Sequence, residues 1–210
     1  NTVQKELLLN ITSKLLSILK SLNISYIMYG GTLLGSFRHH GLIPWDDDVD
    51  ILVSRNKKKD LFSALSGQAP DYGVFNSQKR RVFRFFSTKG KHISKNPWSW
   101  PHVDIFFYGE NKTHIWESCP RKSKIYNYPK NIVFPVHLRP FENLYLNAPK
   151  DSYANLKITY NQTDCATQLW SHKSHKRQTV SVLPCSQFVD RLPFVFRVRG
   201  PVYGVEERLI

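Results

Sequence analysis

The 210-residue chain lacks several features that would decide its class at once. It has no run of about 18 apolar residues, so we expect no segment of it to span a membrane. Its three cysteines show no CxxC spacing, which excludes the common zinc and redox motifs. Its only methionine is Met28. We therefore expect a fragment or a processed product, with any signal peptide or membrane anchor upstream.

Familiar binding motifs are absent too. The chain has no Walker A motif, no GxGxxG and no GxSxG, which excludes the common phosphate-binding and serine-nucleophile signatures. Asp46, Asp48 and Asp50 have the spacing of the first EF-hand ligands. That calcium loop also requires glycine and glutamate where this chain has Ile51 and Lys57, so it is excluded. No DNA- or RNA-binding motif is evident, and we expect no nucleic-acid partner.

Acidic residues are scarce, with 16 Asp and Glu against 30 Lys and Arg and a formal net charge of +14. A solvated basic surface accounts for most of this excess, although it also suits an anionic partner. Yet the stretch GLIPWDDDVDILV, residues 41–53, places Asp46, Asp47, Asp48 and Asp50 within five positions. Two unit charges about 4 Å apart repel by roughly 4 kcal/mol at the effective dielectric of a protein surface. A bound cation is the simplest way to offset that repulsion.

Residue patterns predict an α/β or α+β domain with one mixed sheet flanked by helices and an irregular, proline-rich C-terminal region. We expect helices at 3–22, 32–41, 56–66 and 151–160, and strands at 26–31, 49–54, 72–76, 81–87, 102–108 and 113–118. Residues 119–150 carry five of the twelve prolines and should be mostly irregular. We assign residues 1–170 to the domain and 171–210 to a basic and apolar tail of uncertain structure.

Two predicted strands carry carboxylates. Because side chains alternate across a strand, Asp48 and Asp50 should share one face while Val49, Ile51 and Val53 pack on the core. Asp104 lies among apolar residues of the strand at 102–108 and has two interpretations: a salt bridge to an arginine, or a third ligand of the same ion. Oxygen ligands of this kind suit Mg²⁺ or Mn²⁺.

A glycine pair precedes the acidic strand. Gly30 and Gly31 follow one strand and open a helix, where free N–H groups and the Thr32 hydroxyl favour phosphate. Arg38 and His39 lie between this turn and the acids and are candidates to complement negative charge. The HKSH stretch at 172–175 contains metal-ligand residue types, but we interpret it as a solvated basic loop.

The chain has four N-x-S/T sequons, more than its Ser and Thr content leads us to expect. They predict a lumen of the secretory pathway, Golgi or ER, with glycosylation at Asn10, Asn23, Asn111 and Asn161. A disulfide is plausible in that compartment, and we predict one between Cys119 and Cys165.

The stretch GGTLLGSFRHHGLIPWDDDVDI resembles the signature of the LicD/fukutin family, and HVDIFF and the segment 134–160 resemble its later motifs. The resemblance covers roughly residues 20–170. It implies a nucleotidyltransferase-type fold and transfer of a phosphorylated alcohol, such as phosphocholine or ribitol 5-phosphate, from a CDP-linked donor to a glycan. It also implies that Asp48, Asp50 and Asp104 hold the metal and that Gly30, Gly31 and Thr32 contact phosphate. The role of Asp46, a possible further ligand, stays open.

Several alternatives remain open at this level. Asp104 is either a metal ligand or the general base for the acceptor hydroxyl. The enzyme could instead be a DxD glycosyltransferase that uses Mn²⁺ and a nucleotide sugar. A non-enzymatic basic binder of acidic glycans or nucleic acid would also account for the charge. For the preferred function, the partners are a CDP-linked donor and a glycan or glycoprotein acceptor, with membrane contact only through an N-terminal anchor.

Overall fold

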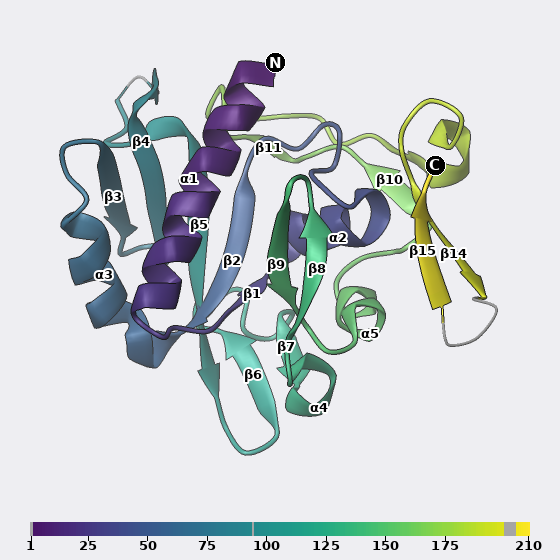
Figure 1. Ribbon diagram of the computed structural model, residues 1–210, viewed down its shortest axis with the longest axis horizontal. Coiled ribbons are helices and arrows are strands. Elements are labelled where there is room, and N and C mark those ends of the chain that lie inside the picture. Colours follow the sequence, from purple (N-terminus) through teal and green to yellow (C-terminus); the bar gives the residue numbers. More distant parts are fainter. Residues whose placement is uncertain (1, 94, 200–204) are drawn as a thin grey trace.

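The N-terminal helix α1, Thr2–Ser21, crosses one face of a mixed sheet in the computed structural model, which describes residues 2–93, 95–199 and 205–210 (Figure 1). The buried residues of α1 recur at helical spacing. They are Leu8, Ile11, Thr12, Leu15, Ile18 and Leu19. Asn23 follows the helix with a φ of 51°, the left-handed conformation that ends many helices. None of the helices in the described ranges is long and apolar enough to cross a bilayer.

The main sheet has seven strands, ordered β1-β2-β5-β4-β3, with β6 pairing β5 and β7 pairing β6. The pair β2 and β5 is parallel, whereas the other pairs are antiparallel. The strand bounds are β1 Tyr26–Met28, β2 Val49–Ser54, β3 Tyr72–Ser77, β4 Val82–His92, β5 Ser99–Glu110, β6 His114–Glu117 and β7 Asn127–Pro129. This mixed sheet flanked by helices confirms the predicted fold class.

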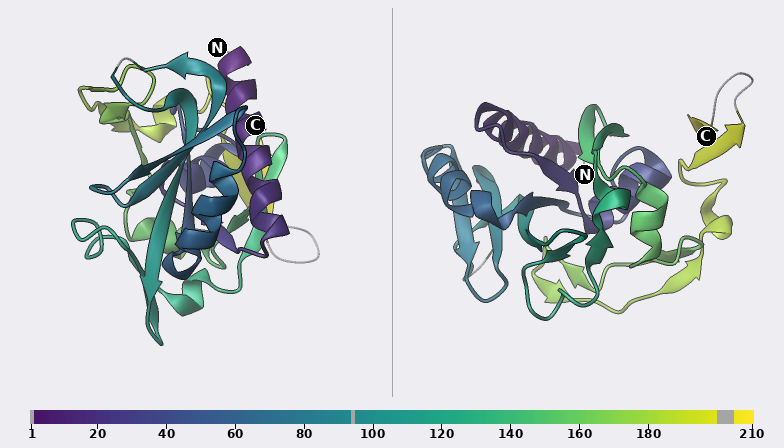
Figure 2. Two further views of the ribbon diagram at one scale, coloured as in Figure 1. Left: turned by 90° about the vertical axis from the view of Figure 1, so that its left-hand side faces the viewer. Right: turned by 90° about the horizontal axis from the view of Figure 1, so that it is seen from below.

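Within the described ranges, four further α-helices connect or cover these strands. Helix α3 lies beside α1 on one face of the sheet (Figure 2), and a short 3₁₀ helix, Arg55–Lys57, precedes it. The bounds are α2 Gly30–His39, α3 Lys58–Ser66, α4 Lys130–Val133 and α5 Ser152–Lys157. The hairpin of β8, His137–Phe141, and β9, Leu144–Ala148, packs against β1. Residues 119–150 therefore hold more regular structure than expected. Pro129 ends β7 and precedes α4, and Pro140 lies within β8, opposite Tyr145.

The two faces of the sheet have different chemistry. Val49, Ile51 and Val53 of β2 are fully buried in the main core, together with α1, α3 and the β8–β9 hairpin. Alternate residues of β2 and β5 point to the opposite face, and these include the carboxylates predicted to form the site. This second face is polar only around the carboxylates, because Leu52 and Tyr108 further along the same strands are buried in a separate apolar cluster.

The chain after residue 160 runs along that polar face and on to the C-terminal hairpin (Figure 2). Its elements are β10 Asp164–Ala166, β11 Trp170–Ser171, β12 Lys176–Arg177, β13 Val182–Pro184, a 3₁₀ helix Cys185–Phe188, β14 Val195–Arg199 and β15 Val205–Leu209. This segment also contacts residues before position 170: Nη2 of Arg139 donates a hydrogen bond of 2.7 Å to Oε2 of Glu207. The domain boundary at residue 170 stays a prediction.

A capping interaction sets the start of α5. The Asp151 side chain accepts a hydrogen bond of 2.9 Å from the N–H of Ala154. We expect Asp151→Ala to lower the free energy of unfolding by about 1 kcal/mol, because one orphan N–H loses its partner. Urea denaturation would measure this, and Asp151→Ser, which keeps an acceptor, should stay near wild type. Equal losses in both variants would contradict the capping role.

Candidate functional site

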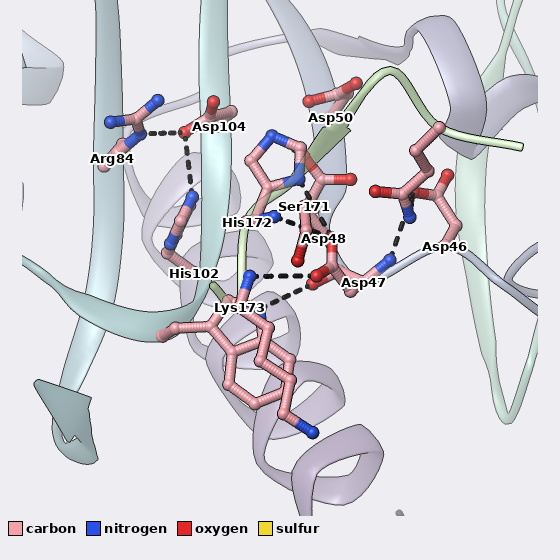
Figure 3. Close-up of polar contacts among 12 residues, drawn as sticks. Asp46, Asp47, Asp48, Asp50, Arg84, His102, Asp104, Ser171, His172 and Lys173 are labelled. Carbon is pink, nitrogen blue, oxygen red and sulfur yellow. Dashed lines mark hydrogen bonds and ion pairs between the residues drawn. The ribbon is translucent and has the colours of Figure 1, made fainter. Parts of the chain in front are cut away.

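Three carboxylates meet at the start of β2. Asp48 directly precedes the strand, Asp50 is its second residue, and Asp104 of β5 is the register partner of Asp50. One oxygen from each of the three lies within 4.8 Å of the others (Figure 3). The three carboxylates therefore lie together, and their roles as ligands or base stay predictions.

Asp104 is also paired with an arginine. Arg84 of β4, the neighbouring strand, bonds Oδ1 of Asp104 at 3.0 Å, and both side chains are almost fully buried. His102 Nε2 lies 3.6 Å from the same oxygen. Burial lowers the pKa of His102 to about 4, so its ring is neutral near pH 7. Asp104 therefore pairs with Arg84 and still faces the other carboxylates, and its role as a metal ligand stays a prediction.

The glycine pair lets helix α2 start directly against these acids. Gly30 has a φ of +56°, and a Cβ there would lie 3.0 Å from Oδ2 of Asp50. A Cβ on Gly31 would lie 2.5 Å from Oδ2 of Asp46, closer than real contacts allow. The Thr32 hydroxyl accepts a 2.7 Å hydrogen bond from the N–H of Asp50. These residues fit the helix terminus to the acidic strand, and their contact with phosphate stays a prediction.

Arg38 and His39 are held by backbone carbonyls. Nη2 of Arg38 donates to the carbonyl oxygens of Asn161, Gln162 and Asp164 at 2.8 to 3.1 Å, which fixes the turn before β10. The His39 ring bonds the carbonyl of Pro193 and is buried. Arg38 lines the cavity that contains the carboxylates, whereas His39 lines a different one. Their predicted role toward phosphate stays a prediction.

The carboxylates are energetically unfavourable as a bare cluster. Burial, followed by the charges of Asp104 and Asp46, raises the pKa of Asp50 to about 8. Burial, followed by the charge of Asp50, also raises the pKa of Asp48. Oxygen donors that are buried, close together and mutually repelling are the set that a hard divalent cation stabilises. Asp48, Asp50 and Asp104 therefore form a group that could hold a metal ion.

In metal-free protein, Asp50 should make stability fall as pH rises. Its pKa is about 8 in the folded protein, against about 3.9 when unfolded. Between those values the folded state keeps a proton that the unfolded state has released, so rising pH favours unfolding. We expect the midpoint temperature of unfolding, measured in EDTA, to decrease as the pH is raised from about 5 to about 8. The same plot of midpoint temperature against pH should be flatter for Asp50→Asn. A parallel profile in that variant would contradict the raised pKa.

His172 is a site residue that our interpretation of the sequence missed. The sequence pattern favours a solvated loop for the HKSH stretch, but His172 contacts the acidic loop. Its Nδ1 lies 2.9 Å from Oδ1 of Asp47, and its Nε2 lies 3.2 Å from Oδ2 of Asp48 (Figure 3). Burial alone would lower the pKa of His172, but the bond to Asp47 and the nearby carboxylates raise it. The HKSH pattern was the only local signal, and it is also typical of exposed basic loops.

The acidic loop is fixed from the same side by Gln168. Its Nε2 donates to Oδ1 of Asp46 at 2.8 Å and to the carbonyl of Trp45 at 2.7 Å. Asp46 Oδ1 also accepts from the N–H of Asp47. Asp46 therefore lies beside the three converging carboxylates, and its Oδ1 is already occupied by hydrogen bonds from Gln168 and Asp47. Its role as a metal ligand stays a prediction.

The predicted disulfide between Cys119 and Cys165 is wrong. Cys165 pairs with Cys185, with Cα atoms 4.9 Å apart, and Cys119 is free. The reason is the antiparallel pairing of β10 with β13, which places Leu183 opposite Cys165 and Cys185 just past the strand end. The disulfide closes the segment that carries Gln168 and His172, so it secures both side chains over the acidic loop.

The carboxylates line a cavity of about 1230 Å³. Basic residues line it as well, from the β3–β4 turn and from the segment that follows β6. They are Lys79, Arg80, Arg81, Arg121 and Lys122. A cavity with both acidic and basic lining suits a ligand that carries phosphates and binds through a cation.

The four sequon asparagines are exposed: Asn10, Asn23, Asn111 and Asn161. Asn161 also uses its side chain to accept from the N–H of Thr163 at 3.2 Å. Exposure is necessary for glycosylation but does not test it, so modification and a secretory location stay predictions.

Comparison with known proteins adds a decisive observation to this geometry. The family model for the LicD/FKTN/FKRP nucleotidyltransferase domain matches residues 23–151, the part of the chain that carries β1, α2, β2 and β5. The chain belongs to the LicD/FKTN/FKRP family. Its membership confirms the resemblance of the glycine pair and acidic strands and, with the mixed sheet, the nucleotidyltransferase-like fold class.

Individual members of the LicD/FKTN/FKRP family are similar over limited lengths. The lipopolysaccharide cholinephosphotransferase LicD of Haemophilus influenzae is 43% identical over 54 residues, which is 26% of this chain and 20% of the relative. The ribitol 5-phosphate transferase FKRP of mouse and of human is 26% identical over 150 residues, or 68% of this chain and 29% of the relative. The chain thus spans less than a third of the length of these curated relatives.

Among solved structures, the lincosamide antibiotic adenylyltransferase LnuA, with lincomycin bound, resembles this LicD/FKTN/FKRP-family chain with a TM-score of 0.47 and 14% identity. The match covers 79% of this chain and 90% of LnuA.

Proposed function

We propose that this domain transfers a phosphorylated alcohol from a CDP-linked donor to a hydroxyl of a glycan, and that it requires a divalent metal ion. The observation that supports this most directly is the convergence of Asp48, Asp50 and Asp104 within 4.8 Å, beside the N-terminus of α2. The relatives LicD and FKRP, which transfer phosphocholine and ribitol 5-phosphate by their names, supply the class of substrate.

The proposed reaction is a substitution at phosphorus. The acceptor oxygen forms a bond to the phosphorus that carries the alcohol, the bond from that phosphorus to the CMP oxygen breaks, and CMP leaves with the electron pair. The hydroxyl proton passes to a carboxylate or to water. A divalent ion, when bound, would neutralise charge that develops on the phosphates. The protein contributes mainly position and electrostatics.

The chain's own residues divide this task. Asp48 and Asp50 would hold the ion, and the N–H groups at Gly30 and Gly31 would face the donor phosphates. Asp104 is the better candidate for a ligand than for the base, because Arg84 binds one of its oxygens while the carboxylate still faces the other two acids. The basic residues of the cavity would complement the rest of the donor's charge.

The site of action that we propose is a secretory-pathway lumen, Golgi or ER. Exposed sequon asparagines and the Cys165–Cys185 disulfide both suit that oxidising compartment. The acceptor is a glycan or glycoprotein, by analogy with relatives that modify lipopolysaccharide or transfer ribitol 5-phosphate. An anchor N-terminal to this chain is part of the same proposal.

A donor panel tests the function. The protein would be incubated with CDP-ribitol, CDP-choline, CDP-glycerol or a nucleotide sugar, each with and without Mn²⁺, and CMP or the released nucleotide would be measured. We expect divalent-dependent CMP release from one CDP-alcohol. Turnover of the nucleotide sugar alone would favour the glycosyltransferase, and salt-sensitive binding of acidic glycans without turnover would favour the basic binder.

A further inference from the structure

His172 is held in one orientation by Asp47. Nδ1 of His172 lies 2.9 Å from Oδ1 of Asp47, which also accepts the N–H of His172 at 3.3 Å. Oδ2 of Asp47 accepts the N–H of Lys173 at 2.9 Å. Because Asp47 accepts three hydrogen bonds from two consecutive residues, it fixes both the backbone and the imidazole ring of the segment that lies over the acidic loop (Figure 3).

This orientation leaves the other ring nitrogen facing the metal-site carboxylate. When Nδ1 donates its proton to Asp47, Nε2 of the neutral ring carries a lone pair. That lone pair lies 3.2 Å from Oδ2 of Asp48, which is itself an acceptor. A positive charge between the two atoms, either a proton on Nε2 or a bound cation, holds them at this separation. The separation is also one at which a nitrogen and an oxygen can bind the same ion at about 2.0–2.2 Å each.

We propose that Nε2 of His172 is a nitrogen ligand of the divalent ion bound by Asp48, and that Asp47 is the carboxylate that orients its ring. This inference rests on the proposed metal dependence. The arrangement has the form in which metal-binding histidines are commonly held, with the second ring nitrogen donating to a carboxylate. Asp47, Asp48 and His172 each offer one atom within 4.8 Å of the others.

A second buried histidine points to the same place. His102 is only 1% exposed, and its buried Nε2 has no hydrogen-bond partner among the described residues. Its ring lies 5.7 Å from the His172 ring, nearly perpendicular to it, and its Nε2 faces Asp104. A buried donor or acceptor without a partner is costly. A water molecule coordinated to an ion between Asp48 and Asp104 would supply the partner that His102 lacks.

A nitrogen ligand changes which ions the site prefers. Imidazole favours transition metals, whereas an all-oxygen set suits Mg²⁺. We therefore expect Mn²⁺ to bind more tightly than Mg²⁺, and His172→Gln to reduce that preference because Mg²⁺ depends less on the nitrogen. Asp47→Asn should weaken Mn²⁺ binding by about 10- to 100-fold, although His172 would still bind the ion, because the ring loses the carboxylate that orients it. Calorimetric titration of each variant with MnCl₂ and with MgCl₂ measures both effects.

Pulsed electron paramagnetic resonance of the full chain loaded with Mn²⁺ tests the ligand directly. Electron spin-echo modulation from ¹⁴N reports an imidazole bound to the ion and needs no donor or acceptor. We expect this modulation in the wild type and its loss in His172→Gln. His175→Gln is the matched control, because His175 lies in the same segment but contacts Trp98, Trp170 and Asn96. Circular dichroism would establish that each variant is folded.

The outcomes separate this inference from the proposed function. Absent ¹⁴N modulation in a wild type that binds Mn²⁺, or modulation that persists in His172→Gln, would overturn the assignment of His172. Failure of Mn²⁺ to bind would overturn both the ligand and the metal dependence. Modulation that depends on His172 without CMP release from any CDP-alcohol would leave the ligand established and the transferase proposal wrong.

Discussion

Replacing Asp48 with asparagine should lower the rate of CMP release by about 10³-fold or more while leaving the domain folded. The neutral amide loses the charge that binds the ion and with it the stabilisation of the leaving phosphate. Asp48 also has a raised pKa, first because it is buried and then because Asp50 is close. The Asp48→Asn change would remove that repulsion, so the metal-free variant should be at least as stable as the wild type.

Steady-state CMP release and thermal unfolding in EDTA, measured on the same preparations, check both halves of this expectation. Asp71→Asn is the control, because Asp71 is exposed in the turn before β3, away from the cavity. Near-normal CMP release by Asp48→Asn would remove the metal site from the mechanism. Loss of folding together with loss of activity would show that Asp48 is needed for structure.

Arg84→Gln should cost about 3–5 kcal/mol of folding free energy, the largest loss of stability that we expect from a single change in the site. Arg84 is 3% exposed and Asp104 is 4% exposed, and they are joined by a bond of 3.0 Å. The guanidinium also stacks over the Trp98 ring at 4.3 Å. Glutamine would leave the Asp104 carboxylate buried without its partner, which is why the expected cost is far above that of a surface pair.

A double-mutant cycle isolates this charge effect. We expect Asp104→Asn in the Arg84→Gln background to recover part of the loss, because the second change removes the unpaired charge. Urea denaturation would measure the four proteins of the cycle. The exposed pair of Arg208 and Glu206 provides the comparison, since Arg208→Gln should cost less than about 1 kcal/mol. A cost for Arg84→Gln within that range would contradict the strength assigned to the buried pair.

The carboxylates could be predicted because the signals that place them are local. Alternation along β2 directs Val49, Ile51 and Val53 to the core, so Asp50 must point to the other face. The same rule applies to Asp104 on β5. What the rule does not contain is the register that places Asp50 opposite Asp104, or the arginine of β4 that lies beside them.

The partners from the end of the chain could not be predicted in the same way. His172 contacts Asp47 across 125 positions of sequence, and the HKSH pattern is equally typical of an exposed basic loop. The disulfide was assigned wrongly for a related reason: Cys185 reaches Cys165 only because β10 and β13 pair. Such contacts depend on the path of a long segment, which no short pattern records.

The sequence by itself determined the order of helices and strands from α1 to β6, the acidic face of β2 and β5, and the glycine turn that meets it. These follow from alternation, helical spacing and the freedom of glycine at positive φ, which are properties of neighbouring residues. Tertiary structure alone decided that Arg84 pairs with Asp104, that His172 faces Asp48 and that Cys165 joins Cys185. Each of these joins elements whose relative positions depend on the packing of the whole domain.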